Sequence, residues 1–450
     1  MQKSLFYPLI LLIVFLLPLN AMADRYVRKG GSNSGTNWTT AYPLLATAEA
    51  NATGGETIWV ADGDFADGRV TYNSSHGTNV ITIKKATIAE HGTETGWDDS
   101  YGDGQASLSG ITFDSDYWHL DGSTRTTISS GHGFTLGPHS GQAIRMQASN
   151  ITISYLEVEG GGDDGDGPGN DLIYSLASHD NVTLEYSYFH DSGRTMILSR
   201  GGTGWIVQHN YWYKNESVAA EHSEMWSTGS NSNMVIRYNI FELWEGTGCI
   251  ARLDSSGTGN WEIYGNVFMK SPSGSGNGVI TTDSDSTLSD VEVYNNVFYD
   301  NGQVIKIGPG GGGSGSGWIV RNNIFLDNWR DDSTACSISG TASHNWYYNN
   351  LCTPPSQTAR QDASADPFTN ADGYDFTLTG ATDAGFDTGA AVAGNDTDPD
   401  GVTRGADGNW DRGAYEYGTS TPTNAITGVT IGNLETTEAL ISWNRSDGLR

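Results

Sequence analysis

The stretch Trp318-Ile-Val-Arg-Asn-Asn323-Ile-Phe325 decides the fold, because the same phrase recurs along the chain. In each copy an alternating apolar strand leads to an asparagine, and an apolar pair follows it. The other copies place this asparagine at Asn210, Asn239, Asn266, Asn296 and Asn350. By subtraction, the successive spacings from 210 to 350 are 29, 27, 30, 27 and 27 residues. A repeat of this length predicts a solenoid in which each unit contributes one coil.

The repeat unit fits one coil of a right-handed parallel β-helix. A second short apolar strand lies between the phrases, as in Met196-Ile-Leu198 and Val304-Ile-Lys-Ile307, and polar, glycine-rich turns join the strands. Coils of ~23–31 residues are too short for four-stranded propeller blades, and the leucine-rich pattern is missing. Stacked coils lie ~4.8 Å apart, so equivalent residues form ladders along the axis. We expect each asparagine to adopt the left-handed conformation at a bend and to hydrogen-bond the next coil.

The start of the chain reads as an export signal. Lys3 gives a positive start, an apolar run covers residues 5–19, and Ala21-Met-Ala23 is a small-x-small cleavage site. We therefore expect residues 1–23 to be a signal peptide and the protein to be secreted, either into the medium or onto the cell surface. The β-helix is expected over residues 24–417, with an N-terminal cap over 24–110 and a closing segment over 385–417. A Ser/Thr/Pro linker follows over 418–424.

Charge restricts the partners. The formal net charge of −30 argues against nucleic acid, which needs a basic surface. It also repels an acidic polysaccharide, unless bound cations or a local basic strip reverse the field. After the apolar start, no segment is apolar enough to span a membrane. We expect a monomer without an organic cofactor.

Both ends of the mature chain resemble known sequences. Residues 25–42 resemble the opening of secreted, pectate-lyase-like β-helix proteins, and Asp411-Arg-Gly-Ala-Tyr-Glu-Tyr417 resembles their closing segment. Residues 425–450, with Ile441-Ser-Trp443, resemble the first strands of a fibronectin type III domain, which needs about 100 residues, so we expect a truncated start of one. The first resemblance implies the β-helix fold. It leaves function open, because this fold carries lyases, hydrolases and adhesins.

Candidate site residues gather in consecutive coils. Strand alternation predicts that Met225 and Leu253 point inward, so their neighbours face outward into one sugar-binding groove. The candidate catalytic residues are His222, Glu224, Arg252, Asp254 and Lys306. The candidate substrate contacts are His190, Arg194, Trp226 and Trp244.

The stretch from Glu221 to Arg252 resembles polysaccharide lyases of the chondroitinase B and alginate lyase type. The resemblance implies calcium ligands at Glu224 and at either Glu221 or His222, and a catalytic arginine at Arg252. The catalytic lysine of that family has no counterpart in residues 226–233.

Three functions follow from these residues. A lyase acting on an acidic glycan needs a cation for the uronate carboxylate, a base and an acid. Calcium on Glu221, Glu224 and Glu185 would supply the cation, with His222 or Lys306 as base and Arg252 stabilising or protonating. A glycoside hydrolase would instead use Glu224 and Asp254 as its carboxylate pair. The third function is a non-catalytic glycan-binding or adhesion protein.

A second calcium site is expected near the end of the β-helix. Asp396, Asp398 and Asp400 space their oxygens like a calcium-binding loop, and Asp407 falls at the twelfth position.

Overall fold

The computed structural model describes residues 24–417 except for short gaps at 33, 67, 140, 162–170, 216–222, 245–247, 253–256, 272–277, 283–284, 307–313, 329–339, 352 and 380–385. The signal peptide, the linker and the fibronectin-like stub predicted from the sequence lie outside the described residues. No helix in the described part is long and apolar enough to cross a membrane.

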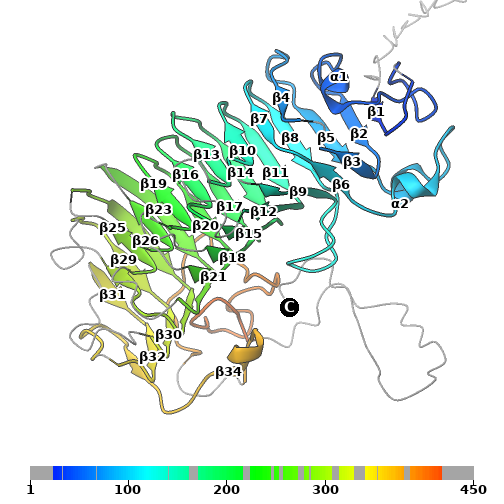
Figure 1. Cartoon of the computed structure of the whole chain (residues 1–450). Coiled ribbons are helices and arrows are strands. Elements are labelled where there is room, and N and C mark those ends of the chain that lie inside the picture. The colour runs from blue at the N-terminus through cyan, green and yellow to red at the C-terminus, as the bar shows by residue number, and fades with distance from the viewer. Residues whose placement is uncertain are drawn as a thin grey trace, which may run out of the picture.

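The chain winds through three long parallel sheets, as Figure 1 shows, and this confirms the predicted right-handed parallel β-helix. Sheet A contains β1 (Arg25–Val27), β2 (Thr57–Val60), β5 (Ile81–Lys85), β8 (Trp118–Asp121), β11 (Ile151–Ser154), β14 (Val182–Glu185), β17 (Ile206–Gln208), β20 (Val235–Arg237), β23 (Thr258–Tyr264), β26 (Ser289–Tyr294), β29 (Ile319–Arg321) and β31 (Thr341–Ser343).

Sheet B contains β3 (Gly63–Phe65), β6 (Ala106–Leu108), β9 (Phe134–His139), β12 (Leu156–Gly160), β15 (Tyr188–Ser192), β18 (Tyr211–Asn215), β21 (Ile240–Trp244), β24 (Val267–Met269), β27 (Val297–Tyr299), β30 (Ile324–Leu326), β32 (Trp346–Tyr348) and β33 (Gln361–Asp362). Sheet C contains β4 (Val70–Tyr72), β7 (Ile111–Phe113), β10 (Ile144–Met146), β13 (Ile173–Ser175), β16 (Ile197–Ser199), β19 (Trp226–Thr228), β22 (Ile250–Arg252), β25 (Ile280–Thr282) and β28 (Ile305–Lys306).

Short elements decorate the two ends of the solenoid. Near the N-terminus lie two short helices, α1 (Leu45–Glu49) and α2 (Ile88–His91), and a 3₁₀ turn over Asp99–Tyr101. Near the C-terminus, β34 (Phe368–Asn370) and β35 (Asp375–Leu378) form an antiparallel pair around a 3₁₀ turn over Ala371–Gly373.

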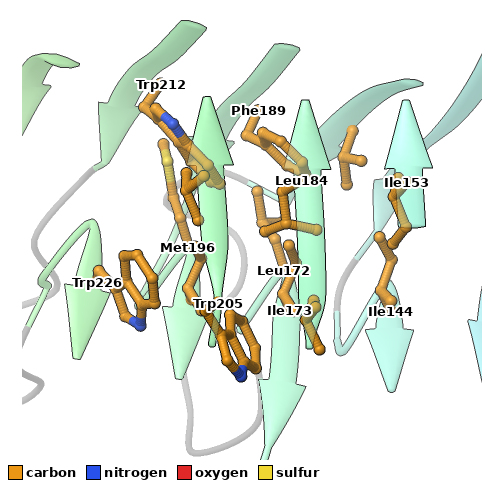
Figure 2. Close-up of a cluster of buried hydrophobic side chains, with 14 of the residues drawn as sticks. Ile144, Ile153, Leu172, Ile173, Leu184, Phe189, Met196, Trp205, Trp212 and Trp226 are labelled. Carbon is orange, nitrogen blue, oxygen red and sulfur yellow. The ribbon is translucent and has the colours of Figure 1, made fainter. Parts of the chain in front are cut away.

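Like residues stack inside the solenoid from coil to coil. The inward-facing rings of sheet B form one file, in which neighbouring ring centroids lie 4.1–6.1 Å apart. The file consists of Phe189, Trp212, Phe241, Phe268, Phe298, Phe325 and Tyr347. Figure 2 shows its beginning, where Phe189 and Trp212 lie above the aliphatic core. Burying large rings in register stabilises the stack and fixes the position of each coil.

The predicted asparagine ladder is present between sheets A and B, with two corrections. Nδ2 of Asn239 donates to Oδ1 of Asn266 at 3.0 Å, and the pattern continues coil by coil to the contact of Asn323 with Asn345. The last member is therefore Asn345 and not Asn350, whose Oδ1 instead accepts from the backbone N–H of Asn328 in a second ladder. The left-handed residue is the one before the ladder asparagine, as at Tyr238 with φ 60°.

The C-terminal segment, residues 366–379 and 386–417, folds back onto the solenoid, and we call it the C-terminal strap. Its Phe376 and Tyr415 belong to an apolar cluster that covers the outer face of sheet B from β18 onward. At the edge between sheets A and B, the Tyr238 hydroxyl donates to the carbonyl of Thr397 at 2.9 Å. The strap therefore covers part of the outer face of sheet B and the edge between sheets A and B. Figure 1 shows its second part, residues 386–417, in orange beside β21 and β18.

Candidate functional site

Charge is distributed unequally among the three sheets. No Asp or Glu occurs in any of the nine described strands of sheet C, although the whole chain carries 53 acidic residues. Sheets A and B do carry acidic residues, at Asp64, Asp121, Glu157, Glu159, Glu185, Asp191, Glu242, Glu262, Asp290, Glu292 and Asp362. Sheet C instead carries Arg145, Arg252 and Lys306. Of these three, Arg145 is exposed and Arg252 is buried. The described strands of sheet C thus carry positive charge and no carboxylate.

The outward-facing residues of sheet C differ in exposure and charge along the axis of the solenoid. In β10 and β13 the row presents Arg145, which is exposed, and Tyr174, which is half-buried and is the Cα partner of Arg145. In the following coils the same row holds Leu198, Ser227 and Ala251, which are at most 5 % exposed. The accessible part of the face is thus the cationic end around β10 and β13.

Two arginines flank this end of the sheet. Arg194 precedes β16, and its Nη1 lies 2.9 Å and 3.0 Å from the two carboxylate oxygens of Asp171. Arg200 follows β16, and its Nη1 lies 3.2 Å from the hydroxyl of Ser227 in the next coil. Burial raises the pKa of Asp171 to about 6, although Arg194 and Arg200 oppose the shift. Asp171 thus holds Arg194 in place at the edge between sheets B and C.

His190 lies on the outer face of sheet B, in a network of alternating charges. Its Nδ1 lies 2.7 Å from Asp191, and its Nε2 lies 3.7 Å from Glu157. Asp191 also contacts Lys214 at 3.0 Å. Burial lowers the pKa of His190, but the contacts with Glu157 and Asp191 outweigh it and raise the pKa above its ordinary value. His190 and Arg194 are four residues apart in the sequence. His190 lies on the outer face of sheet B, whereas Arg194 lies at the edge between sheets B and C.

The tryptophans predicted to contact sugar are buried, so that prediction is wrong. Trp226 and Trp244 are at most 1 % exposed and belong to the interior core. Trp226 donates from Nε1 to the hydroxyl of Ser199 at 2.9 Å. Figure 2 shows its ring inside the coil, beside Trp205. The chain bends at Met225, so Met225 and Trp226 both point inward and the expected alternation restarts at the strand.

The prediction that Glu224 and Arg252 face one outer groove is also wrong. Both residues are only 1 % exposed. Arg252 ends β22 and pairs with Thr228, whereas Glu224 precedes β19 by two residues, so the two lie at opposite ends of neighbouring strands. Arg252 follows inward Ile250 by two residues, and this spacing returns its side chain to the interior.

The other predicted catalytic residues are only partly described. Lys306 lies in β28, where its Cα pairs with that of Thr281. Glu221, His222 and Asp254 lie outside the described residues, so their roles remain predictions.

The structure does not assemble the first predicted calcium site from its described members. Glu185 lies in sheet A and accepts a hydrogen bond from Gln208, whereas Glu224 adjoins sheet C. Within the described ranges, no three His, Cys, Asp or Glu side chains form a group that could hold a metal.

The second predicted calcium loop uses its central carboxylate for the backbone. Oδ1 of Asp398 accepts from the N–H groups of Asp400 and Val402, and Oδ2 accepts from that of Glu416. Asp407 caps Asn409 in the same way, and no shared ligand set with Asp396 and Asp400 is among the described contacts. Burial raises the pKa of Asp398 to about 6, although the backbone N–H donors oppose this shift. Calcium binding by this protein remains a prediction.

The sequence alone did not predict four residues of this end of sheet C, namely Asp171, Arg145, Arg200 and Tyr174. The signal that marks them is the absence of acidic residues from the second strand of each repeat, which becomes visible only once these strands are aligned in register.

Comparison with known proteins establishes the fold. No family model matches the sequence, and no curated protein matches it either. The chain is similar in structure to pectate lyase Pel9A, with 16% identity and a TM-score of 0.53 over 88% of this chain and 98% of that one. It is also similar to the PL6 family polysaccharide lyase Pedsa3628 from Pseudopedobacter saltans, with 14% identity and a TM-score of 0.42 over 74% and 89% of the two chains. The fold is a pectate-lyase-like parallel β-helix.

Proposed function

We propose that this protein is a polysaccharide lyase that binds an acidic glycan at the cationic end of sheet C. The observation that carries the proposal is the acid-free sheet C, with Arg145 on its outer face and Arg194 and Arg200 at its edge. The fold shared with pectate lyase Pel9A supports a polysaccharide as substrate. This site corresponds to the local basic strip that an acidic polysaccharide would need on so acidic a protein.

The residues suit the binding step of a β-elimination. An arginine pairs with a uronate carboxylate through two parallel hydrogen bonds, and neutralising this carboxylate makes the proton beside it easier to remove. Tyr174 lies beside Arg145 in the outward row and carries a phenol that can exchange a proton with a sugar oxygen. His222 remains a predicted base. Lys306 lies in β28, six strands from β10 along sheet C, so it is too far from Arg145 to serve as the base at this end of the sheet.

A panel of alginate, pectate, ulvan and glycosaminoglycans, each with and without calcium, tests the proposal. We expect a rise in ultraviolet absorbance from the unsaturated uronate product on at least one glycan. Arg194→Met should abolish most of this rise. Arg321→Met is the matched control, because Arg321 pairs with Glu292 on sheet A. New reducing ends without the absorbance would indicate a hydrolase and contradict the lyase.

A non-catalytic glycan-binding protein is the second candidate. Arg252 and Glu224 are buried at opposite ends of neighbouring strands, and this arrangement favours binding without cleavage. Retention of the protein by an acidic glycan gel, with no product from any glycan of the panel, would favour this second function over the lyase.

A further inference from the structure

Arg252 is a fully buried cation without a carboxylate partner among the described residues. Its one hydrogen bond within that part of the chain runs from Nη1 to the backbone oxygen of Asn231, at 3.3 Å. The same oxygen also accepts from Nε1 of Trp261 at 3.1 Å, so it is shared. Nε of Arg252 is buried with no hydrogen-bond partner in the structure.

The surroundings of Arg252 offer further polar groups but no acidic one in the described contacts. Thr228 and Thr282 are its Cα partners in the coils before and after, and both are buried. The hydroxyl of Thr282 is also buried without a partner, and Thr282 is only 1 % exposed. Two orphaned hydrogen-bond donors thus lie in adjacent coils.

An unpaired guanidinium in the interior is costly, because burial removes its hydration and no opposite charge replaces it. Burial lowers the pKa of Arg252, but arginine stays protonated near neutral pH. The indole of Trp261 compensates only in part, since its ring centroid lies 5.9 Å from Cζ of Arg252. Among the described residues no negative group meets this guanidinium, and a bound anion would supply one.

We infer that Arg252 and Thr282 form a buried site for a small inorganic anion of the size of chloride. The anion would accept hydrogen bonds from the Arg252 guanidinium and the Thr282 hydroxyl, and so satisfy both orphaned donors. Arg252 is only 1 % exposed, so a sugar ring cannot reach its guanidinium and the ligand would have to be a small ion. A carbon atom added at Gly257 would lie 3.7 Å from Nη2, so this glycine covers the guanidinium closely.

This site is independent of the proposed glycan function. It faces the interior corner between sheets C and A, whereas the proposed glycan site lies on the outer face around β10 and β13. The anion would stabilise the solenoid at β22 and β25 through ligand linkage, whether or not the protein cleaves glycans.

Thermal unfolding of the mature protein, with sodium chloride titrated against sodium gluconate at constant ionic strength, tests the inference. Gluconate is too large for the site, so we expect a saturable rise of Tm with chloride in the wild type. Arg252→Met should remove the saturable part, and Thr282→Val should shift it to higher chloride. Arg237→Met, on the outer face of sheet A, is the control and should keep it.

Two outcomes would overturn the inference. The first is a wild-type Tm that does not respond to chloride beyond gluconate, as expected if water fills the corner. The second is the same chloride response in wild type and Arg252→Met. Should Arg252→Met fail to fold, an unchanged chloride midpoint in Thr282→Val would likewise count against the site.

Discussion

Nη1 of Arg194 contacts both carboxylate oxygens of Asp171, and the Asp171 side chain is completely buried. A buried carboxylate that faces an arginine holds the guanidinium in one orientation. Because Arg194 is at the edge of the acid-free sheet, the state of Asp171 should affect how this edge receives an anionic ligand.

Asp171→Asn should change the pH dependence of stability. Burial raises the pKa of Asp171 from 3.8 to about 6, so the folded protein keeps this proton at a pH where the unfolded chain has lost it. The resulting stabilisation is full below 3.8 and is lost as pH rises through about 6. We therefore expect the Tm difference between wild type and Asp171→Asn to change across this window and to be constant above it. A parallel pair of Tm curves would contradict the assignment.

Asn266→Ala should strongly destabilise the solenoid. The buried Asn266 amide donates to the carbonyls of Ile236 and Tyr264 and to Asn296, and its oxygen accepts twice from Asn239. Losing it leaves several buried polar groups unpaired, so we expect a loss of about 2–4 kcal/mol in the free energy of unfolding.

The control for this change is Asn260→Gly. Asn260 is exposed and has φ 47°, a conformation that glycine adopts freely. A cost within about 0.5 kcal/mol is expected in urea denaturation. Equal costs for the two variants would mean that the inner ladder has no special role.

The ladder also shows what the sequence could predict. Its asparagines and the phenylalanines that follow them recur because each coil stacks the same side chain on its neighbours in the ladder. The spacing of these residues in the sequence therefore predicts the fold. The period fails where a coil is short: only 22 residues separate Asn323 from Asn345, and a constant spacing therefore points to Asn350.

Side-chain direction was harder to predict than the fold. Inward and outward side chains alternate within a strand. At each bend between sheets the alternation starts again, because the number of residues in the bend differs from coil to coil. Cys249 and Ile250 are both interior, as are Met225 and Trp226. Alternation alone therefore predicts that Trp226 and Arg252 face outward, and it does not identify the outer row of sheet C.

Glu242→Gln should loosen the C-terminal strap. The Glu242 carboxylate is 1 % exposed and accepts from the hydroxyls of Tyr211 at 2.6 Å and Tyr374 at 2.8 Å, with Lys270 at 3.4 Å. Tyr374 belongs to the strap, so this contact ties the strap to β21. An amide has one oxygen and no charge, so we expect faster hydrogen exchange in residues 368–378. Glu292→Gln on sheet A should leave that exchange unchanged.

The Debye length is about 10 Å at 0.1 M salt, so above this concentration the repulsion from distant acidic residues is largely screened. The remaining attraction between the glycan and the arginines of sheet C should then weaken as more salt is added. Arg145→Ala should lower the affinity about tenfold, or ~1.4 kcal/mol, and should reduce the salt dependence. Arg321→Ala removes one positive charge from sheet A and should change neither property by a comparable amount. Affinity electrophoresis in pectate gels at several salt concentrations measures both. If Arg321→Ala weakens binding as much as Arg145→Ala, the effect reflects net charge, and sheet C is not the binding face.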